Sequence, residues 1–362
     1  MKIIYFSKSY SPHDHRFLSA LAKTDHEVYF VRLEPARNES EDRIVPTEIE
    51  QIRWAGGGRE FRWVDVPKYV RSLKQVIAKL QPDLIHAGPI QTVGLIAVLT
   101  GFRPILMMSW GYDLMMDVHR NKWWERITYF VLRRSTFFTS DAQVTRDKAV
   151  HYGMNPERTI VFPWGVDLAH FKPNRKTEKP DNGITLFCNR SWEPIYGVDV
   201  LARAFVRATQ TQPNLRLILL GGGSLGGQLR RILSPVKEQI LFGGYKSQKE
   251  LPRFYNMADV YISPSHIDGS SVSLMEAMGC GLPCLVSDIP ANKEWVTDDE
   301  NGWLFADGDV ASLTEKILLA AEKRDTLIEM GVRSREIAEQ RADWTKNFKK
   351  LLDAYERTAA IK

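Results

Sequence analysis

The sequence predicts an α/β protein made of two doubly wound, Rossmann-like units, and three observations lead to this prediction. Short apolar runs alternate with helical patterns along the whole chain, which is typical of parallel sheets covered by helices. The chain has 362 residues, and a single hydrophobic core seldom serves a chain of that length. Residues 163–183 are rich in Pro, Lys and Asn and lack periodicity, so they are interpreted as a linker between two halves of similar size.

Strands are expected in both halves. In the first half they are residues 3–6, 28–31, 84–86, 105–108, 137–139 and 159–162, and in the second half residues 184–188, 215–220, 239–242, 260–263 and 284–287. The predicted domains are residues 1–172 and 173–343, and the last helix, within residues 344–362, is expected to pack back on the first domain. Doubly wound sheets bind ligands at the carboxyl ends of their strands. Two half-sites facing a cleft are therefore expected.

Composition is ordinary for a globular protein, with 44% apolar and 26% charged residues. The three cysteines lie in apolar runs, and an odd, sparse count predicts a reducing, cytoplasmic compartment rather than a disulfide framework. Cys280 and Cys284 have no companions at zinc spacing, so core packing is the interpretation for both. The first residues, MKIIYFS, have the pattern of a strand rather than a signal peptide. No apolar run reaches the ~18 residues of a membrane span.

The positive charge is concentrated in the first half. Residues 1–172 contain 24 Lys and Arg against 19 Asp and Glu, whereas the remaining residues contain 25 of each. This excess suits an anionic acceptor or an anionic membrane surface, although a solvated surface is its commonest meaning. Residues 119–134 mix aromatic and basic side chains, which suits either an interfacial helix or core packing. No nucleic-acid-binding signature occurs, so nucleic acid is not an expected partner.

The segment 256–281 carries the clearest site signal. Glu276 lies in an almost wholly apolar helical stretch, where an unpaired charge costs several kcal/mol, so a partner must receive it. Asp268 precedes it by eight residues, and residues 269–271, Gly-Ser-Ser, expose backbone N–H groups before the helix. A helix start of this kind binds anions. Two structural readings stay open: Ser273-x-x-Glu276 fits a capping box, and Asp268-Gly269 fits a turn.

Other polar or glycine residues follow the predicted strands. Arg190 follows residues 184–188, and the loop Gly221–Gly227 follows residues 215–220. This loop lacks the Gly-Lys-Ser/Thr of a phosphate-binding loop, and close backbone packing is the safer interpretation. His86 and Trp110 occupy the corresponding ends in the first half. Strand ends are often polar in any case, so Arg190 and the glycine loops only modestly favour a site.

Taken together, these stretches resemble the retaining glycosyltransferase family 4, a large group with the GT-B fold. The resemblance covers most of the chain and is strongest in residues 155–310. Its motifs are VFPWGVDLAHFKP at the predicted junction, LILLGGGSL, the run from Tyr255 to Pro283 with its acidic-x7-Glu spacing, VSDIPANKEWVTDDENGWLFADGD, and SWGYD in the first half.

The resemblance implies transfer of a sugar, with retention, from a nucleotide-diphosphate donor to a glycan, lipid-linked or other hydroxyl acceptor. It places the donor in the second domain and the acceptor in the first. Glu276 matches the Glu that accepts the ribose hydroxyls, Asp268 stands where a Glu contacts the donor sugar, and Arg190 matches a phosphate-clamping Arg. The implied donor-binding residues are Gly269, Ser270, Ser271, Val272, Ser273, Gly222, Tyr245 and Lys246, and the implied acceptor or cleft residues are His13, His86, Trp110 and Asp113.

Two departures from the family pattern concern the donor site and the first loop. The family has a Lys shortly after the clamping Arg, but Tyr196 stands before Gly197 here, and Lys246 is the suggested substitute. The first loop carries Pro12-His13-Asp14-His15 in place of paired glycines. One of the histidines, His13, His15 or His86, could polarise the acceptor hydroxyl, but a structural role is the commoner one for each.

No cofactor or metal is expected, because Arg190 and the helix start suit a leaving diphosphate without one. The only Asp-x-Asp, Asp307-Gly308-Asp309, precedes a helical pattern and fits a turn with an N-cap. A catalytically silent module that binds nucleotide-sugar is the alternative hypothesis, kept open by Tyr196 and Asp268. A GT-B-like epimerase or phosphorylase is a third, although no cofactor-binding Lys stands out. Contact with the inner membrane surface is a further expectation.

Overall fold

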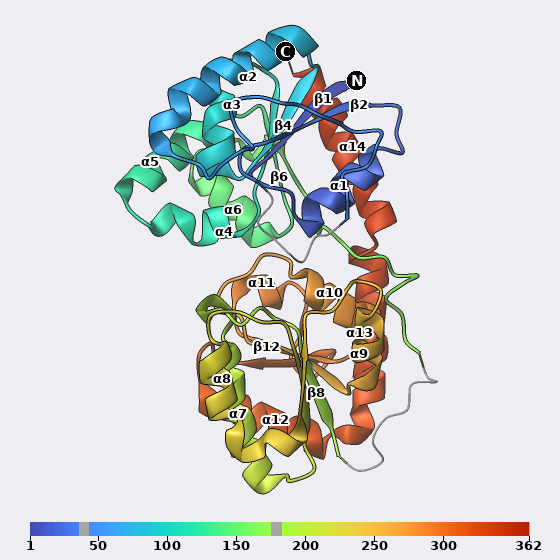
Figure 1. Cartoon of the computed structure of the whole chain (residues 1–362). Helices are drawn as coiled ribbons and strands as arrows, with labels where there is room; N and C mark the ends of the chain where they lie inside the picture. Colours follow the sequence, from blue (N-terminus) through green and yellow to red (C-terminus); the bar gives the residue numbers. More distant parts are fainter. Residues whose placement is uncertain (36–42, 175–182, 362) are drawn as a thin grey trace. The chain divides into compact units, whose positions relative to one another are not determined.

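The computed structural model describes residues 1–35, 43–174 and 183–361. The chain divides into two compact units, each with its own sheet and helices (Figure 1). Unit 1 comprises Met1–Phe162 together with Phe348–Lys362, and unit 2 comprises Pro163–Asn347.

Among the described residues of unit 1, seven strands form one parallel sheet in the order β3-β2-β1-β4-β5-β6-β7. The strands are β1 (Lys2–Ser7), β2 (Glu27–Arg32), β3 (Glu50–Gln51), β4 (Leu84–Gly88), β5 (Ile105–Met108), β6 (Phe137–Ser140) and β7 (Thr159–Val161). The helices that connect them are α1 (Pro12–Leu21), α2 (Val66–Leu80), α3 (Leu95–Leu99), α4 (Tyr112–Met115), α5 (Lys122–Leu132) and α6 (Gln143–His151).

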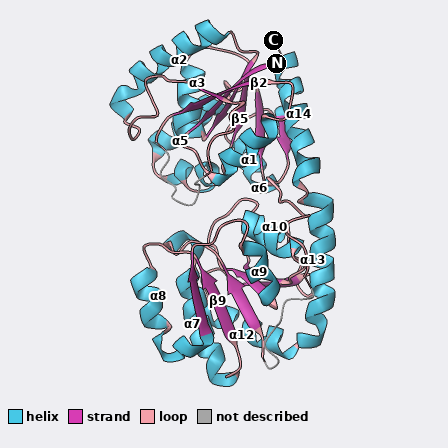
Figure 2. Ribbon diagram, turned by 45° about the vertical axis from the view of Figure 1, so that its right-hand side comes forward, coloured by secondary structure: helices cyan, strands magenta, loops and turns pink. Residues whose placement is uncertain are grey.

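Alternation along the strands of unit 1 builds a core on each face of its sheet. Ile4 and Ile85 belong to the cluster that also contains residues of α2, α3 and α5. Tyr5 and His86, one position further along each strand, contact Phe17 of α1, and His86 also contacts the last helix, α14 (Trp344–Ala360). Figures 1 and 2 show α2 and α3 on one face of the sheet and α1 and α14 on the other.

Among the described residues of unit 2, six strands form a second parallel sheet in the order β10-β9-β8-β11-β12-β13. The strands are β8 (Thr185–Cys188), β9 (Arg216–Leu220), β10 (Ile240–Gly244), β11 (Val260–Ser263), β12 (Cys284–Ser287) and β13 (Gly302–Phe305). The helices are α7 (Val198–Thr211), α8 (Gly226–Ile232), α9 (Leu251–Met257), α10 (Val272–Gly279), α11 (Pro290–Lys293), α12 (Val310–Glu322) and α13 (Leu327–Arg341).

The two faces of the second sheet bury separate apolar clusters. Leu186, Leu219 and Ile262 pack with α7, α8 and α12 in one cluster. Phe187 and Tyr261, which point the other way, pack with α9, α10 and α13 in the other. Both sheets are thus parallel and doubly wound, which confirms the predicted α/β class. β3 and β13 lie outside the predicted strands.

The boundary between the units lies after Phe162, and not after residue 172. The segment expected to be a linker begins with packed residues: Val166 and Phe171 are buried in a cluster of unit 2, and Val166 forms a β-bridge with Asp343. Residues 175–182 of that expected linker lie outside the described residues. The last helix, α14, starts in unit 2, and its residues from Phe348 onward belong to unit 1.

Candidate functional site

The carboxyl ends of the unit 2 strands carry most of the predicted site residues. Arg190 lies two positions after β8, and the segment from Pro264 to Ser271 connects β11 to α10. Gly222 follows β9, where a side chain would meet the Tyr245 ring at 3.0 Å. Lys246 follows β10 and places its ammonium 5.6 Å from the Phe254 ring centroid. All four loops lie at one edge of the sheet, because its strands are parallel.

α10 begins at Val272, and Ser271 is its N-cap, with its hydroxyl accepting from the Leu274 N–H at 3.4 Å. The alternative in which Ser273 caps the helix with Glu276 at N3 is therefore wrong. Ser270 is held separately, because its Oγ accepts a 3.1 Å hydrogen bond from the Trp295 indole N–H. The Gly-Ser-Ser segment thus leads directly into the helix start, as the sequence indicated.

Glu276 is buried within α10, with 2% of its surface exposed. The Tyr255 hydroxyl donates to Glu276 Oε2 at 2.8 Å, and the Gln248 amide donates to Oε1 at 3.3 Å. These two hydrogen-bond donors are the partners that the buried charge of Glu276 was expected to need. Tyr255 comes from α9 and is fully buried, whereas Gln248 belongs to the exposed loop after β10.

Arg190 is the centre of a second group of contacts. Its Nη2 donates to Asp268 Oδ2 at 2.7 Å, and the two side chains are 11% and 16% exposed. Its Nη1 donates to Ser271 Oγ at 2.7 Å and to Ser273 Oγ at 3.1 Å. The guanidinium lies over the Tyr196 ring, 4.3 Å from the centroid. One cation therefore joins the loop that ends β8 to the loop that opens α10.

Two further side chains connect the Arg190 group to Glu276. The Tyr261 hydroxyl lies within hydrogen-bond distance of both Ser273 Oγ, at 2.8 Å, and Asn189 Oδ1, at 3.1 Å. The Asn189 amide donates in turn to the Tyr255 hydroxyl at 2.9 Å. A continuous hydrogen-bond network thus runs through both carboxylates. Buried networks of this kind fix side-chain positions when their members are satisfied.

The pKa values of Asp268 and Arg190 reflect both their burial and their attraction to each other. Burial raises the pKa of Asp268, while Arg190, the Gly269 N–H and the Ser265 hydroxyl act in the opposite direction. Burial is the largest single influence on Arg190 and lowers its pKa. The Asp268 carboxylate, together with Tyr261, Tyr196 and Cys188, outweighs burial and holds the pKa of Arg190 above its usual value. Removing one partner would leave the other as a buried, uncompensated charge.

Two of the predicted unit 1 residues, His13 and Trp110, lie side by side, and a third, Asp113, lies in a hydrogen-bonded cluster of its own. His13 lies beside Trp110, with ring centroids 5.6 Å apart, and burial together with Arg16 lowers the pKa of His13 to about 4. Asp113 is fully buried: Ser109 Oγ donates to Oδ1 at 2.5 Å, and the Ile90 N–H donates to Oδ2 at 3.1 Å. Burial raises the pKa of Asp113 to about 6.

His86 does not lie at an accessible strand end. It occupies the middle of β4 with 1% of its surface exposed, and its Nδ1 is 2.8 Å from the Tyr355 hydroxyl of α14. Its Nε2 is 3.2 Å from Met108 Sδ, and burial lowers its pKa to about 3. The expectation that His86 faces the cleft is wrong, because strand alternation turns it under α1 and α14. The structural role, which the sequence left open, fits these contacts.

The segment Pro12–His15 belongs to α1 and is not a loop. Ser11 caps this helix and forms a capping box with Asp14. Asp14 was not among the predicted site residues. It is nearly fully buried, with 2% of its surface exposed, and burial raises its pKa to about 6. The Ser-x-x-Asp spacing was the available signal.

The N-cap predicted at Asp309 is confirmed. Asp309 Oδ1 accepts hydrogen bonds from the Ala311 and Ser312 N–H groups at the start of α12.

The tyrosines of the unit 2 network were not among the predicted site residues. Tyr255 and Tyr261 precede the site in helix α9 and strand β11, and nothing in their local pattern separates them from core residues. Asn189 is different, because its position directly after a buried strand already places it, with Arg190, at the predicted ligand-binding edge. Their roles depend on contacts between elements far apart along the chain.

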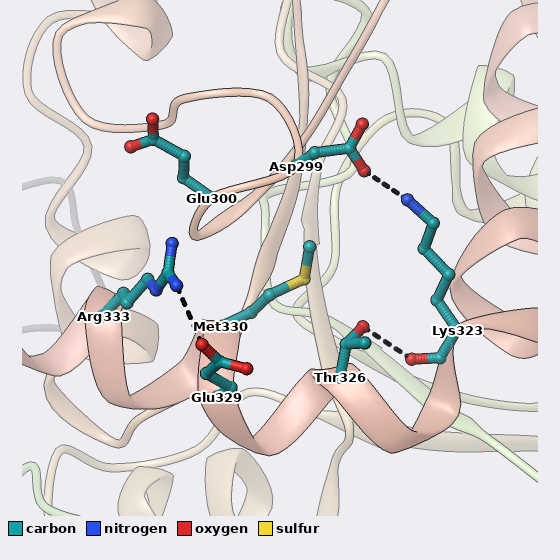
Figure 3. A pocket seen from close by; sticks show the side chains of 7 residues that line it. All are labelled: Asp299, Glu300, Lys323, Thr326, Glu329, Met330 and Arg333. Carbon is teal, nitrogen blue, oxygen red and sulfur yellow. Dashed lines mark hydrogen bonds and ion pairs between the residues drawn. The ribbon is translucent and has the colours of Figure 1, made fainter.

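A pocket of about 200 Å³ lies elsewhere in unit 2, between the residues before β13 and α13 (Figure 3). Four of its charged side chains form two pairs: Lys323 with Asp299 at 2.7 Å, and Arg333 with Glu329 at 2.8 Å. It adjoins the amino end of β13, whereas the predicted site residues gather at the carboxyl ends. Within residues 1–35, 43–174 and 183–361, no group of three or more His, Cys, Asp and Glu side chains is placed to hold a metal.

Two family models match the chain. The model described as glycosyl transferases group 1 matches residues 171–351, which include all of the Arg190–Glu276 network. The model described as glycosyl transferase 4-like matches residues 2–142. Among the described residues, no helix has both the length and the apolar character needed to cross a membrane.

Relatives of known name extend the match. A phosphatidyl-myo-inositol mannosyltransferase of Propionibacterium freudenreichii subsp. shermanii is 31% identical over 193 residues, 51% of this chain and 48% of that protein. A GDP-mannose-dependent alpha-(1-6)-phosphatidylinositol monomannoside mannosyltransferase of Mycolicibacterium smegmatis is 26% identical over 307 residues, 77% of each chain. The chain spans about half the length of the first relatives that it matches, namely 48%, 39% and 51%.

Solved structures share the fold over the whole chain. Sucrose-phosphate synthase from Thermosynechococcus elongatus has a TM-score of 0.81 at 18% identity, covering 100% of both chains. Anabaena HepE in complex with UDP also has a TM-score of 0.81 at 18% identity, covering 98% of this chain and 100% of that chain. The chain belongs to the glycosyl transferases group 1 family, and its two doubly wound units are those of the GT-B fold.

Proposed function

We propose that this protein is a retaining, metal-independent glycosyltransferase that moves a sugar from a nucleoside-diphosphate-sugar to a hydroxyl acceptor. Unit 2 holds the donor and unit 1 receives the acceptor. The observation that carries the proposal is the network that gathers Arg190, Asp268 and Glu276 around the start of α10. A buried cation beside a helix N-terminus suits a diphosphate, and the carboxylates suit hydroxyl groups.

The proposed chemistry is electrostatic. Departure of a nucleoside diphosphate develops negative charge, and fixed donors at that position lower the barrier. Arg190 supplies a permanent charge, and the N–H groups in the first turn of α10 supply aligned dipoles. Asp268 is placed to accept from hydroxyls of the donor sugar. Glu276 accepts from the ribose hydroxyls, which replace the weak contact from Gln248 at 3.3 Å.

The names of the relatives support a nucleotide-sugar donor and leave its base open. The Mycolicibacterium smegmatis relative is named for GDP-mannose, whereas the Anabaena HepE structures contain UDP and UDP-glucose. Lipid-linked and glycan hydroxyls are the proposed acceptors. The cytoplasmic location stays a prediction.

A peripheral membrane contact is part of the proposal and involves one surface of unit 1. Trp63, Val64 and Trp123, here called the Trp63–Trp123 patch, are 40%, 73% and 61% exposed. Trp63 meets Trp124 edge-on at 5.8 Å, and Arg120 lies over Trp124 at 4.7 Å. Exposed indoles among arginines suit the headgroup region of an anionic membrane.

The first experiment measures binding of UDP and GDP by calorimetry, followed by sugar transfer from UDP-glucose and GDP-mannose. We expect one nucleoside diphosphate to bind and its sugar to be transferred or slowly hydrolysed. The paired variant Arg190→Gln/Asp268→Asn should abolish binding while leaving no buried charge unpaired. Its melting temperature serves as the folding control. Failure of both nucleotides to bind the wild type would overturn the proposal, and binding without any turnover would favour the silent module.

Glu276→Gln tests the ribose contact separately. We expect this isosteric change to lower affinity for the bound nucleoside diphosphate about 10- to 100-fold, since a charged acceptor is worth ~1.5–3 kcal/mol. The matched ligand is the 2′,3′-dideoxy analogue, which lacks the hydroxyls that Glu276 would accept. Wild type should prefer the ribose form, and the variant should not. Equal preference in both proteins would contradict this role.

A further inference from the structure

Tyr196 is held beside Arg190 by a tight turn. It ends the short 3₁₀ turn Pro194–Tyr196, with its N–H donating to Glu193 O at 2.9 Å. Gly197 follows with φ +59°, and a side chain there would come within 2.1 Å of Pro264 O. The turn therefore lies directly against the end of β11. This packing holds Tyr196 next to the loop that carries Asp268.

The Tyr196 ring confines the Arg190 guanidinium from one face. The guanidinium carbon lies 4.3 Å from the ring centroid, which is the geometry of a cation–π contact. In the guanidinium's own plane, Nη1 donates to two serine hydroxyls, and Nη2 donates to Asp268. Stacking thus restricts tilting of the guanidinium, while the in-plane hydrogen bonds restrict its rotation.

The Nε–H of Arg190 remains unused. In the part of the chain that the structure describes, Nε is buried and has no acceptor. A buried donor without an acceptor costs ~1–3 kcal/mol, and such a group in a native structure needs an explanation. The Asp268 bond is the exchangeable one, because a diphosphate offers more anionic oxygens than a single carboxylate. An arriving diphosphate can thus take both the Nε–H and the Nη2–H in a two-pronged contact.

We propose that Tyr196 is a positioning residue for the donor diphosphate: its ring holds the Arg190 guanidinium in one plane, so that Arg190 passes from Asp268 to the diphosphate by in-plane movement. Tyr196 then acts by orienting the existing cation and not by adding a second charge. This inference rests on the proposed function, and it assigns a role to a residue that, in the described part of the chain, makes no hydrogen bond to Asp268 or Glu276 itself.

The test compares nucleoside diphosphates with the matching nucleosides, using UDP with uridine and GDP with guanosine. Wild type, Tyr196→Leu and Tyr196→Phe are titrated by calorimetry or by competition. We expect Tyr196→Leu to lose about tenfold in affinity for the bound diphosphate, as for a desolvated cation–π contact. Its affinity for the nucleoside should change less than about twofold by the same argument, since the nucleoside makes no phosphate contact. Tyr196→Phe, which keeps the ring, should retain the wild-type ratio.

The control is Phe130→Leu, which removes a comparable arginine contact in unit 1, where Arg134 lies 4.0 Å over the Phe130 ring. It should leave both affinities unchanged. A merely structural role for Tyr196 would lower affinity for nucleoside and diphosphate alike, and that result would overturn the inference. An unchanged ratio in Tyr196→Leu, with diphosphate still bound by the wild type, would overturn it and leave the proposed function standing. Absence of diphosphate binding by the wild type would overturn both.

Discussion

Asp14 and Asp113 are buried carboxyl groups in unit 1, and burial raises the pKa of each to about 6. Both accept hydrogen bonds from serine hydroxyls and backbone N–H groups, which favour the charged form but do not outweigh burial. An arginine lowers the pKa of Asp268, but among the described residues no arginine is a main influence on the pKa of Asp14 or Asp113. These two residues therefore connect the folding free energy of unit 1 to pH.

The pH dependence of Asp113 has a definite sign. Its pKa of about 6 in the folded protein exceeds the value of about 3.9 in unfolded chains. Its stabilising contribution is therefore complete below about pH 4 and is lost as the pH rises through 6. The loss amounts to about 3 kcal/mol. Asp113→Asn, which is neutral throughout, should not show it.

Urea unfolding of wild type and Asp113→Asn between pH 4 and pH 7 measures this effect. The free energy of unfolding of the variant, relative to the wild type, should rise by about 3 kcal/mol over that range. Asp14→Asn provides a second, matched variant with the same expected sign. A difference that does not vary with pH would contradict the assignment.

At the scale of single elements, α5 combines core and surface functions. Asn121 caps it by accepting from the Trp123 and Trp124 N–H groups. Ile127 and Val131 are buried on its inner side, whereas Trp123 is 61% exposed near its start. The core-packing reading of residues 119–134 fits the later aromatics, which pack against the core. The first remains outside, and the interfacial reading stays a prediction.

The Trp63–Trp123 patch gives a prediction at this scale. Val64→Ser/Trp123→Ser should weaken sedimentation with vesicles containing phosphatidylglycerol about tenfold, since burying apolar side chains in a membrane is worth ~1 kcal/mol or more each. Vesicles of phosphatidylcholine alone should bind neither protein well. Ile328→Ser is the matched control, because Ile328 is 79% exposed in unit 2. Equal binding of the patch variant and the control would refute the membrane contact.

At the scale of the whole molecule, the division into two units predicts which unit a bound nucleotide stabilises. Arg190, Asp268 and Glu276 all belong to unit 2, within Pro163–Asn347. A ligand stabilises the state to which it binds, by about 2.7 kcal/mol at a hundredfold excess over its dissociation constant. Stabilisation should therefore appear first in the amides of unit 2.

Hydrogen exchange with and without the bound nucleoside diphosphate checks this location. We expect slower exchange in β11 and α10 and smaller changes in β1 and β4, because the former carry the proposed contacts. The Arg190→Gln/Asp268→Asn variant is the control and should show no nucleotide-dependent change. Protection of β1 and β4 alone would place the nucleotide in unit 1 and refute the assignment of the units.

Local signals in the sequence account for most of the fold and for part of the site. The buried runs of β1, β4, β8 and β11 are apolar over nearly their whole length, so each was predictable without tertiary information. β3, with its two polar residues, and β13, which follows the turn at Asn301, carry too little pattern to be recognised. Their pairing with β2 and β12 decides their conformation.

By itself, the sequence determined the α/β class, the helix with a charge in an apolar setting, and the strand-end Arg190, because apolar periodicity and local spacing specify these. Only the tertiary structure decided that Tyr255 receives Glu276, that Tyr196 stacks on Arg190, and that His86 is covered by α14. The contacts of Tyr255 with Glu276 and of His86 with α14 join different elements of the chain, whereas Tyr196 and Arg190 lie in one loop and are brought together by the turn Pro194–Tyr196. Their partners are chosen by how the helices pack on the sheets, and no local pattern encodes that choice.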